Sequence, residues 1–266
     1  MTLQEAVDGN RVWYHTLELP GGVVTPGWFD LRAVAQRLPW PDVRGKRCLD
    51  VGTYDGFFAF ELERRGAAEV VAVDVPDHAD WDWPPDVRAQ GPGRLAELAG
   101  PEKGRGFEIA RTALGSSVEK VDMTIYGLDP EQLGTFDVVV CGSLLLHLRD
   151  PLRALEAIRG VCSGVLLSSE EIDLALSLRH PRRPVARING SGELAQWWVP
   201  NVAGHRRMVF AAGFRILAAM RPYSDPFGVS HPLGHDLRSR LRAAGRTVLT
   251  GNNGVPHAAL LAAPRV

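Results

Sequence analysis

The residues with the clearest chemical meaning form the run DVGTYDG at 50–56, followed by an aspartate at position 74. The run lies between an apolar segment at 47–51 and a segment with helical apolar spacing at 57–65. Gly52 allows the backbone to turn tightly and to approach a ligand, and the next helix points its positive end at the turn. Asp74 comes 18 residues after the run, where a carboxylate can accept hydrogen bonds from a ribose diol. Strand, turn, helix and strand together predict a nucleoside-binding βαβ unit of a parallel sheet.

The spacing of the glycines distinguishes two classes of cofactor. A dinucleotide fingerprint has the pattern G-x-G-x-x-G. Here Gly52 and Gly56 give G-x-x-x-G, and Tyr54 stands where a pyrophosphate would leave no room for a side chain. S-adenosylmethionine has no phosphate and tolerates that side chain, so the turn favours S-adenosylmethionine over a dinucleotide.

Length and composition place these residues in one ordinary α/β domain. The chain has 266 residues, 45% of them hydrophobic and 23% charged, and its formal net charge is -1. This balance provides no global basic field for a nucleic-acid backbone. Cys48, Cys141 and Cys162 lie in apolar runs without disulfide or zinc spacing, so we expect reduced thiols and no metal site. The sequence shows no signal peptide and no apolar run of membrane-spanning length, which predicts a cytoplasmic protein without a membrane partner.

The rest of the chain continues the alternation of helices and strands. An Asp-Pro pair at 150–151 starts a helix whose inner face carries apolar residues. Residues 76–106 are rich in Pro, Gly and Asp and are expected to pass over the nucleotide edge of the sheet. The predicted strands are 47–51, 69–75, 118–126, 136–141, 164–168, 215–220 and 257–263, and the predicted helices include 31–38, 57–65, 107–114 and 201–212.

Several motifs resemble class I S-adenosylmethionine-dependent methyltransferases. The run LDVGTYDGFFAFELERRGAAEVVAVD resembles their opening motif, and FDVVVCGSLLLHLRDPLRALEAI resembles their fourth strand and the helix after it. The upstream WYHTLELPGGVVTPGWFD and the WWVPN segment further resemble the tRNA wobble-uridine (mo5U34) methyltransferase group. The resemblance covers most of residues 11–218. It implies a Rossmann-like α/β fold with a seven-stranded, mostly parallel sheet whose last strand is antiparallel. It also implies an N-terminal lid at 1–40 and a methyltransferase domain at 41–266 with a cap insertion at about 174–205.

The resemblance also assigns residues to the S-adenosylmethionine site. The first turn would line the methionine and ribose side, Asp74 would bind the ribose, and Val75 would lie beside the adenine. Residues after the third and fourth strands would lie near the adenine and the sulfonium, and Trp28 would close over the cofactor. The implied cofactor-binding residues are Trp28, Asp50, Gly52, Thr53, Tyr54, Gly56, Asp74, Val75, Gly127, Leu128, Gly142 and Ser143.

One departure from the group concerns the donor. The carboxymethyl-transferring tRNA enzymes of the group have a tyrosine before the histidine of the fourth-strand motif, and that tyrosine helps to hold the donor's carboxylate. This chain has Leu146 before His147. Because leucine offers no hydrogen bond, we expect ordinary S-adenosylmethionine as the donor.

Candidates for catalysis and acceptor binding follow from side-chain chemistry. His147 comes just after the fourth strand, and His15 lies beside Tyr14; either histidine can accept a proton from an attacking O–H or N–H. Each also has a structural interpretation as a histidine bonded to the backbone. Positioning in line with the sulfonium can suffice without a base. Tyr14, Trp197 and Trp198 are expected to line the acceptor pocket, although the tryptophans can equally form a small satellite core.

Charged residues after the fifth strand leave two interpretations open. The basic run at 179–187 favours a solvated loop, and the alternative is a site for an anionic substrate or for an RNA phosphate. Glu170, Glu171 and Asp173 can face a cationic or hydroxylated substrate or pair with those arginines.

The sequence therefore predicts methyl transfer from S-adenosylmethionine to O or N of a small molecule, in secondary metabolism for example. Nucleic acid is the less favoured partner. A tRNA wobble-base modifier and a catalytically silent module that binds the cofactor are the alternatives. The sequence does not determine the acceptor or the oligomeric state.

Overall fold

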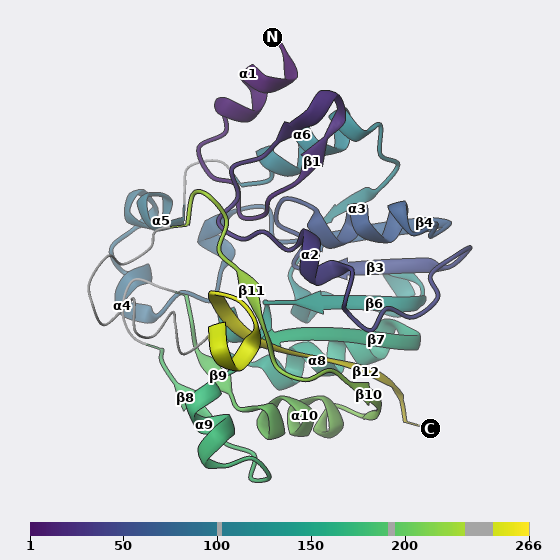
Figure 1. Ribbon diagram of the computed structural model, residues 1–266, viewed down its shortest axis with the longest axis vertical. Coiled ribbons are helices and arrows are strands. Elements are labelled where there is room, and N and C mark those ends of the chain that lie inside the picture. The colour runs from purple at the N-terminus through teal and green to yellow at the C-terminus, as the bar shows by residue number, and fades with distance from the viewer. Residues whose placement is uncertain (100–102, 191–194, 232–246, 266) are drawn as a thin grey trace.

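The computed structural model describes residues 1–99, 103–190, 195–231 and 247–265, and a mixed β-sheet forms its centre (Figure 1). The main sheet has the order β10-β12-β7-β6-β3-β4-β5, and β11 pairs with β12. The five strands β7, β6, β3, β4 and β5, which are neighbours in this order, are parallel to one another. Strand β12 is antiparallel to both β7 and β10. The strands are β3 (Arg47–Val51), β4 (Glu69–Asp74), β5 (Glu119–Asp122), β6 (Phe136–Gly142), β7 (Cys162–Glu171), β10 (Phe214–Ala219), β11 (Tyr223–Pro226) and β12 (Gly254–Pro264).

Helices cover both faces of this sheet because successive side chains of a strand point to opposite faces. Cys48 of β3 belongs to a core with α2 (Arg32–Ala35), α3 (Phe57–Arg64) and α6 (Arg105–Leu114). Leu49, the next residue, belongs to a second core. Its helices are α8 (Pro151–Val161) and α10 (Val202–Ala211), with α7 (Pro130–Leu133) packed against α8.

The N-terminal segment packs on the first of these cores. It contains α1 (Leu3–Asp8), the strands β1 (Glu18–Leu19) and β2 (Val23–Val24), and the single turn η1 (Pro20–Gly22) between them. A capping box of Thr2 and Glu5 starts α1. Trp13 is only 1% exposed and belongs to the core, so much of the segment is built into the domain.

Further elements gather beyond the carboxyl ends of the parallel strands, at the left of Figure 1. After β4 come η2 (His78–Asp80), α4 (Pro85–Arg88) and α5 (Pro92–Ala99), and after β6 comes the turn η4 (Leu145–His147). The segment predicted as a cap, called the cap below, contributes α9 (Leu174–Arg179) and the hairpin of β8 (Ala186–Ile188) with β9 (Trp198–Pro200). Trp83, Val87, Leu95 and Ala195 form a satellite core that joins the excursion after β4 to the cap.

The predicted Rossmann-like fold is confirmed, with differences at element boundaries. The strand predicted at 118–126 ends at Asp122, because Thr124 caps a turn, η3 (Ile125–Gly127), by accepting a hydrogen bond from the Tyr126 amide. β11 was not predicted, because YSDP carries little apolar periodicity. Residues 191–194 of the predicted cap lie outside the described residues.

Two expectations on composition can be compared with the structure. Cys48, Cys141 and Cys162 are buried and free, as predicted. In the part of the chain that the structure describes, every helix is too short or too polar to cross a bilayer.

Candidate functional site

The turn between β3 and α3 is held in an unusual backbone conformation. Gly52 has φ 77° and Gly56 has φ 92°, both in the region that favours glycine. Tyr54 lies between them with φ 48°, and Ser143, directly after β6, has φ 53°. Within the described residues these are the non-glycine residues with positive φ. Because such strain persists mainly at functional sites, the two loops mark one candidate site at the carboxyl edge of β3 and β6.

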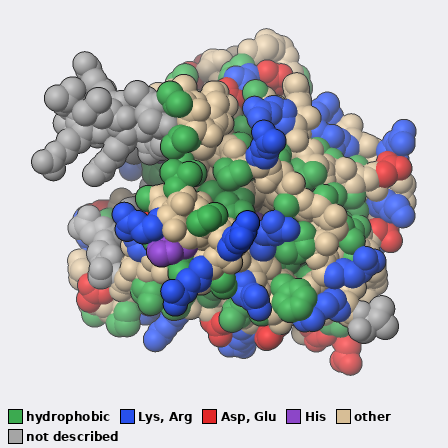
Figure 2. Space-filling view, turned by 60° about the horizontal axis from the view of Figure 1, so that its bottom comes forward, with side chains coloured by type: hydrophobic (Ala, Val, Ile, Leu, Met, Phe, Trp, Pro, Cys, Tyr) green, Lys and Arg blue, Asp and Glu red, His purple; other side chains and the backbone are tan. Residues whose placement is uncertain are grey.

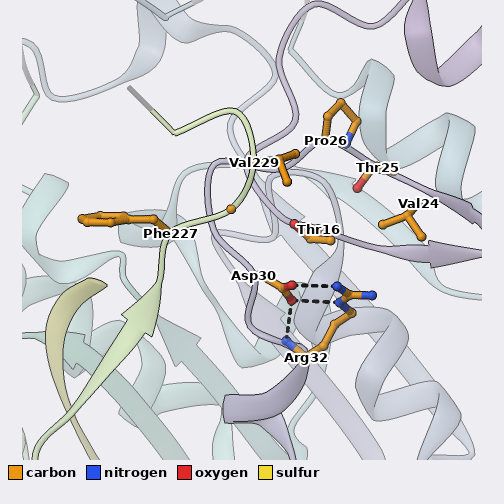
Figure 3. Close-up of a pocket in the computed structure, with 9 residues that line it drawn as sticks. Thr16, Val24, Thr25, Pro26, Asp30, Arg32, Phe227 and Val229 are labelled. Carbon is orange, nitrogen blue, oxygen red and sulfur yellow. Dashed lines mark hydrogen bonds and ion pairs between the residues drawn. The ribbon is translucent and has the colours of Figure 1, made fainter. Parts of the chain in front are cut away.

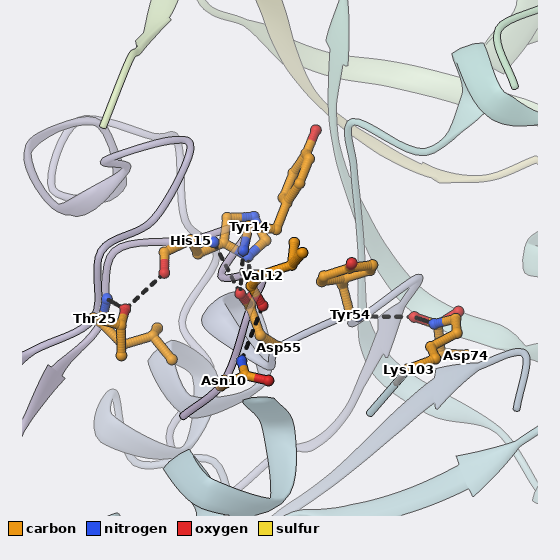
Figure 4. Close-up of polar contacts among 10 residues, drawn as sticks. Asn10, Val12, Tyr14, His15, Thr25, Tyr54, Asp55, Asp74 and Lys103 are labelled. Carbon is orange, nitrogen blue, oxygen red and sulfur yellow. Dashed lines mark hydrogen bonds and ion pairs between the residues drawn. The ribbon is translucent and has the colours of Figure 1, made fainter. Parts of the chain in front are cut away.

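Asp74 ends β4 beside this turn, and backbone amides fix its carboxylate (Figure 4). Its Oδ2 accepts a hydrogen bond of 2.8 Å from the Tyr54 amide, and its Oδ1 accepts one of 2.8 Å from the Val75 amide. The Lys103 ammonium lies 2.7 Å from Asp74 Oδ2 and 5.1 Å from the centre of the Tyr54 ring. Asp74 Oδ2 thus accepts from two donors and Oδ1 from one, so the carboxylate can still accept a hydrogen bond from a hydroxyl.

Asp50 lies near the end of β3 with its carboxyl group buried. It is 2% exposed, and burial raises its pKa to about 7. Among the described residues, Asp50 Oδ2 and Thr53 Oγ1 are buried oxygens without a hydrogen-bond partner. Buried polar atoms normally have partners, so these two fit a ligand that carries hydrogen-bond donors, such as the ammonium of an amino acid.

Asp55 ties the N-terminal segment to the same turn. Its Oδ2 accepts hydrogen bonds from the Tyr14 amide at 2.8 Å and the His15 amide at 2.9 Å, and its Oδ1 bonds to His15 Nδ1. Figure 4 shows these contacts beside the ring of Tyr54, whose centre lies 5.5 Å from that of Tyr14. The structure thus brings Tyr14 and His15 to the turn, with His15 Nδ1 already engaged by Asp55.

Glu170 organises the loop after β6 from within β7. Its carboxylate accepts hydrogen bonds from the Leu144 amide at 3.1 Å and the Leu145 amide at 3.0 Å, and the Cys141 thiol donates to it at 3.3 Å. Burial raises the pKa of Glu170 to about 8. Asp173, by contrast, caps α9 and lies 3.5 Å from Arg187, in line with the expectation that the acids here pair with the arginines.

His147 lies at the junction with the cap. Its Nδ1 bonds to the carbonyl oxygen of Ala195 at 2.6 Å, so Nδ1 carries the proton and Nε2 keeps its lone pair. Burial lowers the pKa of His147, although the bond to Ala195 opposes this. Its role as a base stays a prediction, because the same contacts suit a structural histidine.

Trp197 and Trp198 use both of their indole N–H groups on the backbone. Trp197 Nε1 donates to the carbonyl oxygen of Asp82 at 2.6 Å, and Trp198 Nε1 donates to that of Arg149 at 3.0 Å. These bonds join the cap to the loops after β4 and β6. A role of the two rings in acceptor binding also stays a prediction.

The remaining predicted cofactor residues lie around this edge. Gly127 ends η3, and Leu128 is buried in the second core beside it. Gly142 is the last residue of β6. Trp28 donates its amide hydrogen to the Trp13 carbonyl oxygen at 2.9 Å, and its ring centre lies 6.2 Å from that of Tyr14.

A separate surface pocket of about 420 Å³ lies between the N-terminal segment and the residues after β11 (Figure 3). Asp30 and Arg32 form an ion pair in its wall, and Phe227 and Val229 also line it. None of the predicted site residues lines it. We therefore place the chemistry at the strained turns and not in this pocket.

Sequence reasoning missed several residues that the fold brings to the site. Lys103 and Asp55 were missed, although Asp55 lies inside the recognised turn. Asp225 and His257 were also missed, because β11 and β12 come near the end of the chain and carry no motif. Only the pairing of β12 with β7, and of β11 with β12, brings them to this edge.

Comparisons with known proteins agree with this geometry. The family model described as "Methyltransferase domain" matches residues 29–220. The chain belongs to the methyltransferase domain family. This membership confirms the assignment to class I S-adenosylmethionine-dependent methyltransferases at the level of the family.

Individual relatives are more distant. The chain is 29% identical over 159 residues to a ubiquinone biosynthesis O-methyltransferase from Hahella chejuensis (strain KCTC 2396), covering 58% of this chain and 55% of that protein. This methyltransferase domain thus spans little more than half the length of that relative.

Solved structures share the fold. The N-terminal domain of EvdMO1, crystallised in the presence of SAH and D-fucose, has a TM-score of 0.57 at 15% identity, covering 99% of this chain and 96% of that one. The Burkholderia thailandensis 1,6-didemethyltoxoflavin-N1-methyltransferase, with bound 1,6-didemethyltoxoflavin and S-adenosylhomocysteine, has a TM-score of 0.51 at 16% identity. That match covers 89% of this chain and 78% of the toxoflavin enzyme.

Proposed function

We propose that this methyltransferase domain transfers the methyl group of S-adenosylmethionine to an oxygen or nitrogen atom of a small-molecule acceptor. The observation that carries the proposal is the pair of carboxylates at the ends of neighbouring strands. Asp50, one residue before the end of β3, has a buried oxygen without a hydrogen-bond partner, and Asp74 at the end of β4 can accept a further hydrogen bond. Ligands of open α/β sheets bind at this edge.

Asp74 and Asp50 would bind different parts of the cofactor. Asp74 would accept the ribose hydroxyls, and the buried charge of Asp50 suits the ammonium of the methionine part. S-adenosylmethionine supplies a methyl group on a positively charged sulfur. The protein's part is to hold the acceptor atom in line with that methyl group and to exclude water, which can supply much of the rate.

We infer the chemical class of the acceptor from the similar enzymes and from the acidic side chains near Tyr14. The Hahella relative is named as an O-methyltransferase of ubiquinone biosynthesis, and the toxoflavin enzyme as an N1-methyltransferase. Glu171 and Asp225 both lie close enough to Tyr14 to raise its pKa, although burial is the larger cause. These two carboxyl groups, whose pKa values burial raises, favour a neutral or cationic acceptor over an anionic one.

The first test is binding of S-adenosylhomocysteine by calorimetry, followed by transfer of a labelled methyl group to a panel of phenols, catechols and heterocyclic amines. We expect micromolar binding and label in an organic-soluble product. Failure to bind S-adenosylhomocysteine would refute the proposed function. As a control, adenosine monophosphate should bind much more weakly, because Tyr54 leaves no room for a phosphate.

The resemblance to tRNA wobble-uridine methyltransferases supplies a second candidate. Figure 2 shows Lys and Arg side chains spread over the face that carries the cap and α10. Exposed arginines of this face are Arg179, Arg182, Arg183, Arg206 and Arg207. A protein that uses them on RNA would lose affinity steeply with salt, since each phosphate contact releases counterions. Filter retention of an anticodon stem-loop at 50 and 200 mM salt tests this candidate, with Arg182→Gln/Arg183→Gln as the variant. Retention that is weak and unaffected by the variant would exclude it.

A further inference from the structure

Three polar side chains from distant parts of the chain meet beside the loop after β6. Ser143 Oγ lies 2.7 Å from His257 Nε2, and Asp225 Oδ2 lies 3.2 Å from the same nitrogen. His257 and Asp225 are 3% and 5% exposed, whereas Ser143 is partly exposed. Ser143 is therefore the member of this group that a molecule in the site can reach.

The contacts of His257 determine which nitrogen can accept a proton. Its Nδ1 lies 2.8 Å from the carbonyl oxygen of Val255, which can only accept, so Nδ1 carries the hydrogen. Nε2 then presents its lone pair to the Ser143 hydroxyl. A hydrolase triad has its carboxylate on Nδ1 instead, so this arrangement does not prepare Ser143 as a nucleophile.

Two carboxyl side chains lie beside His257. Asp225 of β11 lies directly at its Nε2, and Glu171 of β7 is opposite His257 in the strand pairing. The Tyr223 ring lies 6.1 Å away, and His205, on the other face of the sheet, has its pKa lowered to about 3, mainly by burial. Nε2 of His257 thus faces the carboxyl of Asp225 and the hydroxyl of Ser143.

The position of the group relates it to methyl transfer. Ser143 is one of the two strained residues of the site, and the other, Tyr54, belongs to the turn assigned to the cofactor. Tyr14 spans the two sides: its ring contacts that of Tyr54, and Glu171 and Asp225 both act on its pKa. A proton acceptor that reaches the site through Ser143 would thus lie where the acceptor atom must approach the methyl group.

We propose that Ser143, His257 and Asp225 form a proton relay that activates the methyl acceptor; this inference rests on the proposed function. The acceptor hydroxyl gives its proton to Ser143 Oγ while Ser143 gives its own proton to His257 Nε2. The electron pair left on the acceptor oxygen forms the bond to the methyl carbon, and the pair of the carbon–sulfur bond leaves with sulfur. The products are a methyl ether, a thioether and an imidazolium beside Asp225, which later releases its proton to water.

The test uses 4-nitrocatechol, whose absorbance reports whether its hydroxyl is ionised, added to the full chain saturated with S-adenosylhomocysteine. The pH is set one unit below that at which the free probe ionises. We expect the wild-type complex to raise the ratio of ionised to neutral probe at least tenfold over solution. His257→Gln keeps a partner for Ser143 but accepts no proton, and should abolish the increase while leaving the affinity for S-adenosylhomocysteine within twofold. With a turned-over acceptor, kcat should fall on the order of 10²–10⁴-fold.

His205→Gln is the matched control, because His205 Nε2 also bonds a serine of the sheet, Ser168, at 2.9 Å. It should leave the probe spectrum unchanged. Should His257→Gln unfold, Asp225→Asn provides the same test, since it removes the carboxyl group beside Nε2. Ionisation that is equal in the wild type and these variants, or absent in the wild type with S-adenosylhomocysteine bound, would overturn the relay alone. Failure of the wild type to bind S-adenosylhomocysteine would overturn the relay and the proposed function together.

Discussion

Replacement of Asp74 probes the assignment of the ribose site most directly. In Asp74→Ala the ribose diol loses its acceptor, and the Tyr54 amide loses a 2.8 Å hydrogen bond. Leaving a buried polar group unsatisfied costs about 1–3 kcal/mol. At about 1.4 kcal/mol for each tenfold change, S-adenosylhomocysteine should bind roughly 5- to 150-fold more weakly. Isothermal calorimetry on the folded variant measures this loss.

Lys103 sharpens the same experiment. Its side chain is 4% exposed and its ammonium binds Asp74 Oδ2, so a ribose hydroxyl must compete with it for that oxygen. Lys103→Met removes the competitor and keeps most of the apolar stem. If the pair contributes a net ~1 kcal/mol, S-adenosylhomocysteine should bind roughly fivefold more tightly to this variant.

The two variants together can refute the reasoning. Unchanged affinity in a folded Asp74→Ala would show that the ribose lies elsewhere. Weaker binding to Lys103→Met would show that Lys103 contacts the ligand and does not compete with it. Asp122→Asn, at the end of the neighbouring strand β5, is the control and should bind like the wild type.

Three further predictions follow from burial and pKa. Because burial raises the pKa of Asp50 to about 7, its carboxyl group becomes charged as pH rises through 7. S-adenosylhomocysteine should therefore bind roughly tenfold more tightly at pH 8 than at pH 6, and calorimetry should show no such pH dependence in Asp50→Asn. Burial raises the pKa of Glu170 to about 8, so the folded state holds a proton that the unfolded state releases near pH 4.5. The free energy of unfolding should therefore fall by up to about 1.4 kcal/mol per pH unit between pH 5 and 8. In urea titrations, the free energy of unfolding of Glu170→Gln should depend less on pH. Trp13→Ala should lower the free energy of unfolding by about 3–5 kcal/mol in the same titrations, since Trp13 is 1% exposed; a loss below 1 kcal/mol would mean that the N-terminal segment is a detachable lid.

The N-terminal segment shows how far sequence reasoning reached. The concentration of aromatic residues predicted that it would cover the open edge of the sheet, and this stays a prediction; in the structure the amides of Tyr14 and His15 donate to Asp55 of the first turn. Composition did not show that Trp13 and Leu17 would be part of the main core. A lid and a core element can have the same local sequence, because only the packing partner distinguishes them.

The first βα turn was determined by sequence because its requirements are local. A glycine where φ is 77°, a helix after it and an acid at the end of the next strand are each fixed by neighbouring residues. The alternation of strands and helices likewise fixed the parallel sheet. Asp50 and Asp74 could therefore be proposed as cofactor-binding residues without knowledge of the fold.

Only the tertiary structure decided what faces that turn. Lys103 reaches Asp74 across 29 positions of the chain, and His257 reaches Ser143 across 114. The second contact exists because β12 runs antiparallel beside β7 and brings residue 257 opposite residue 171. Pairing between strands so far apart in the chain depends on the order of all strands in the sheet, and no sequence motif around His257 or Asp225 predicts that order.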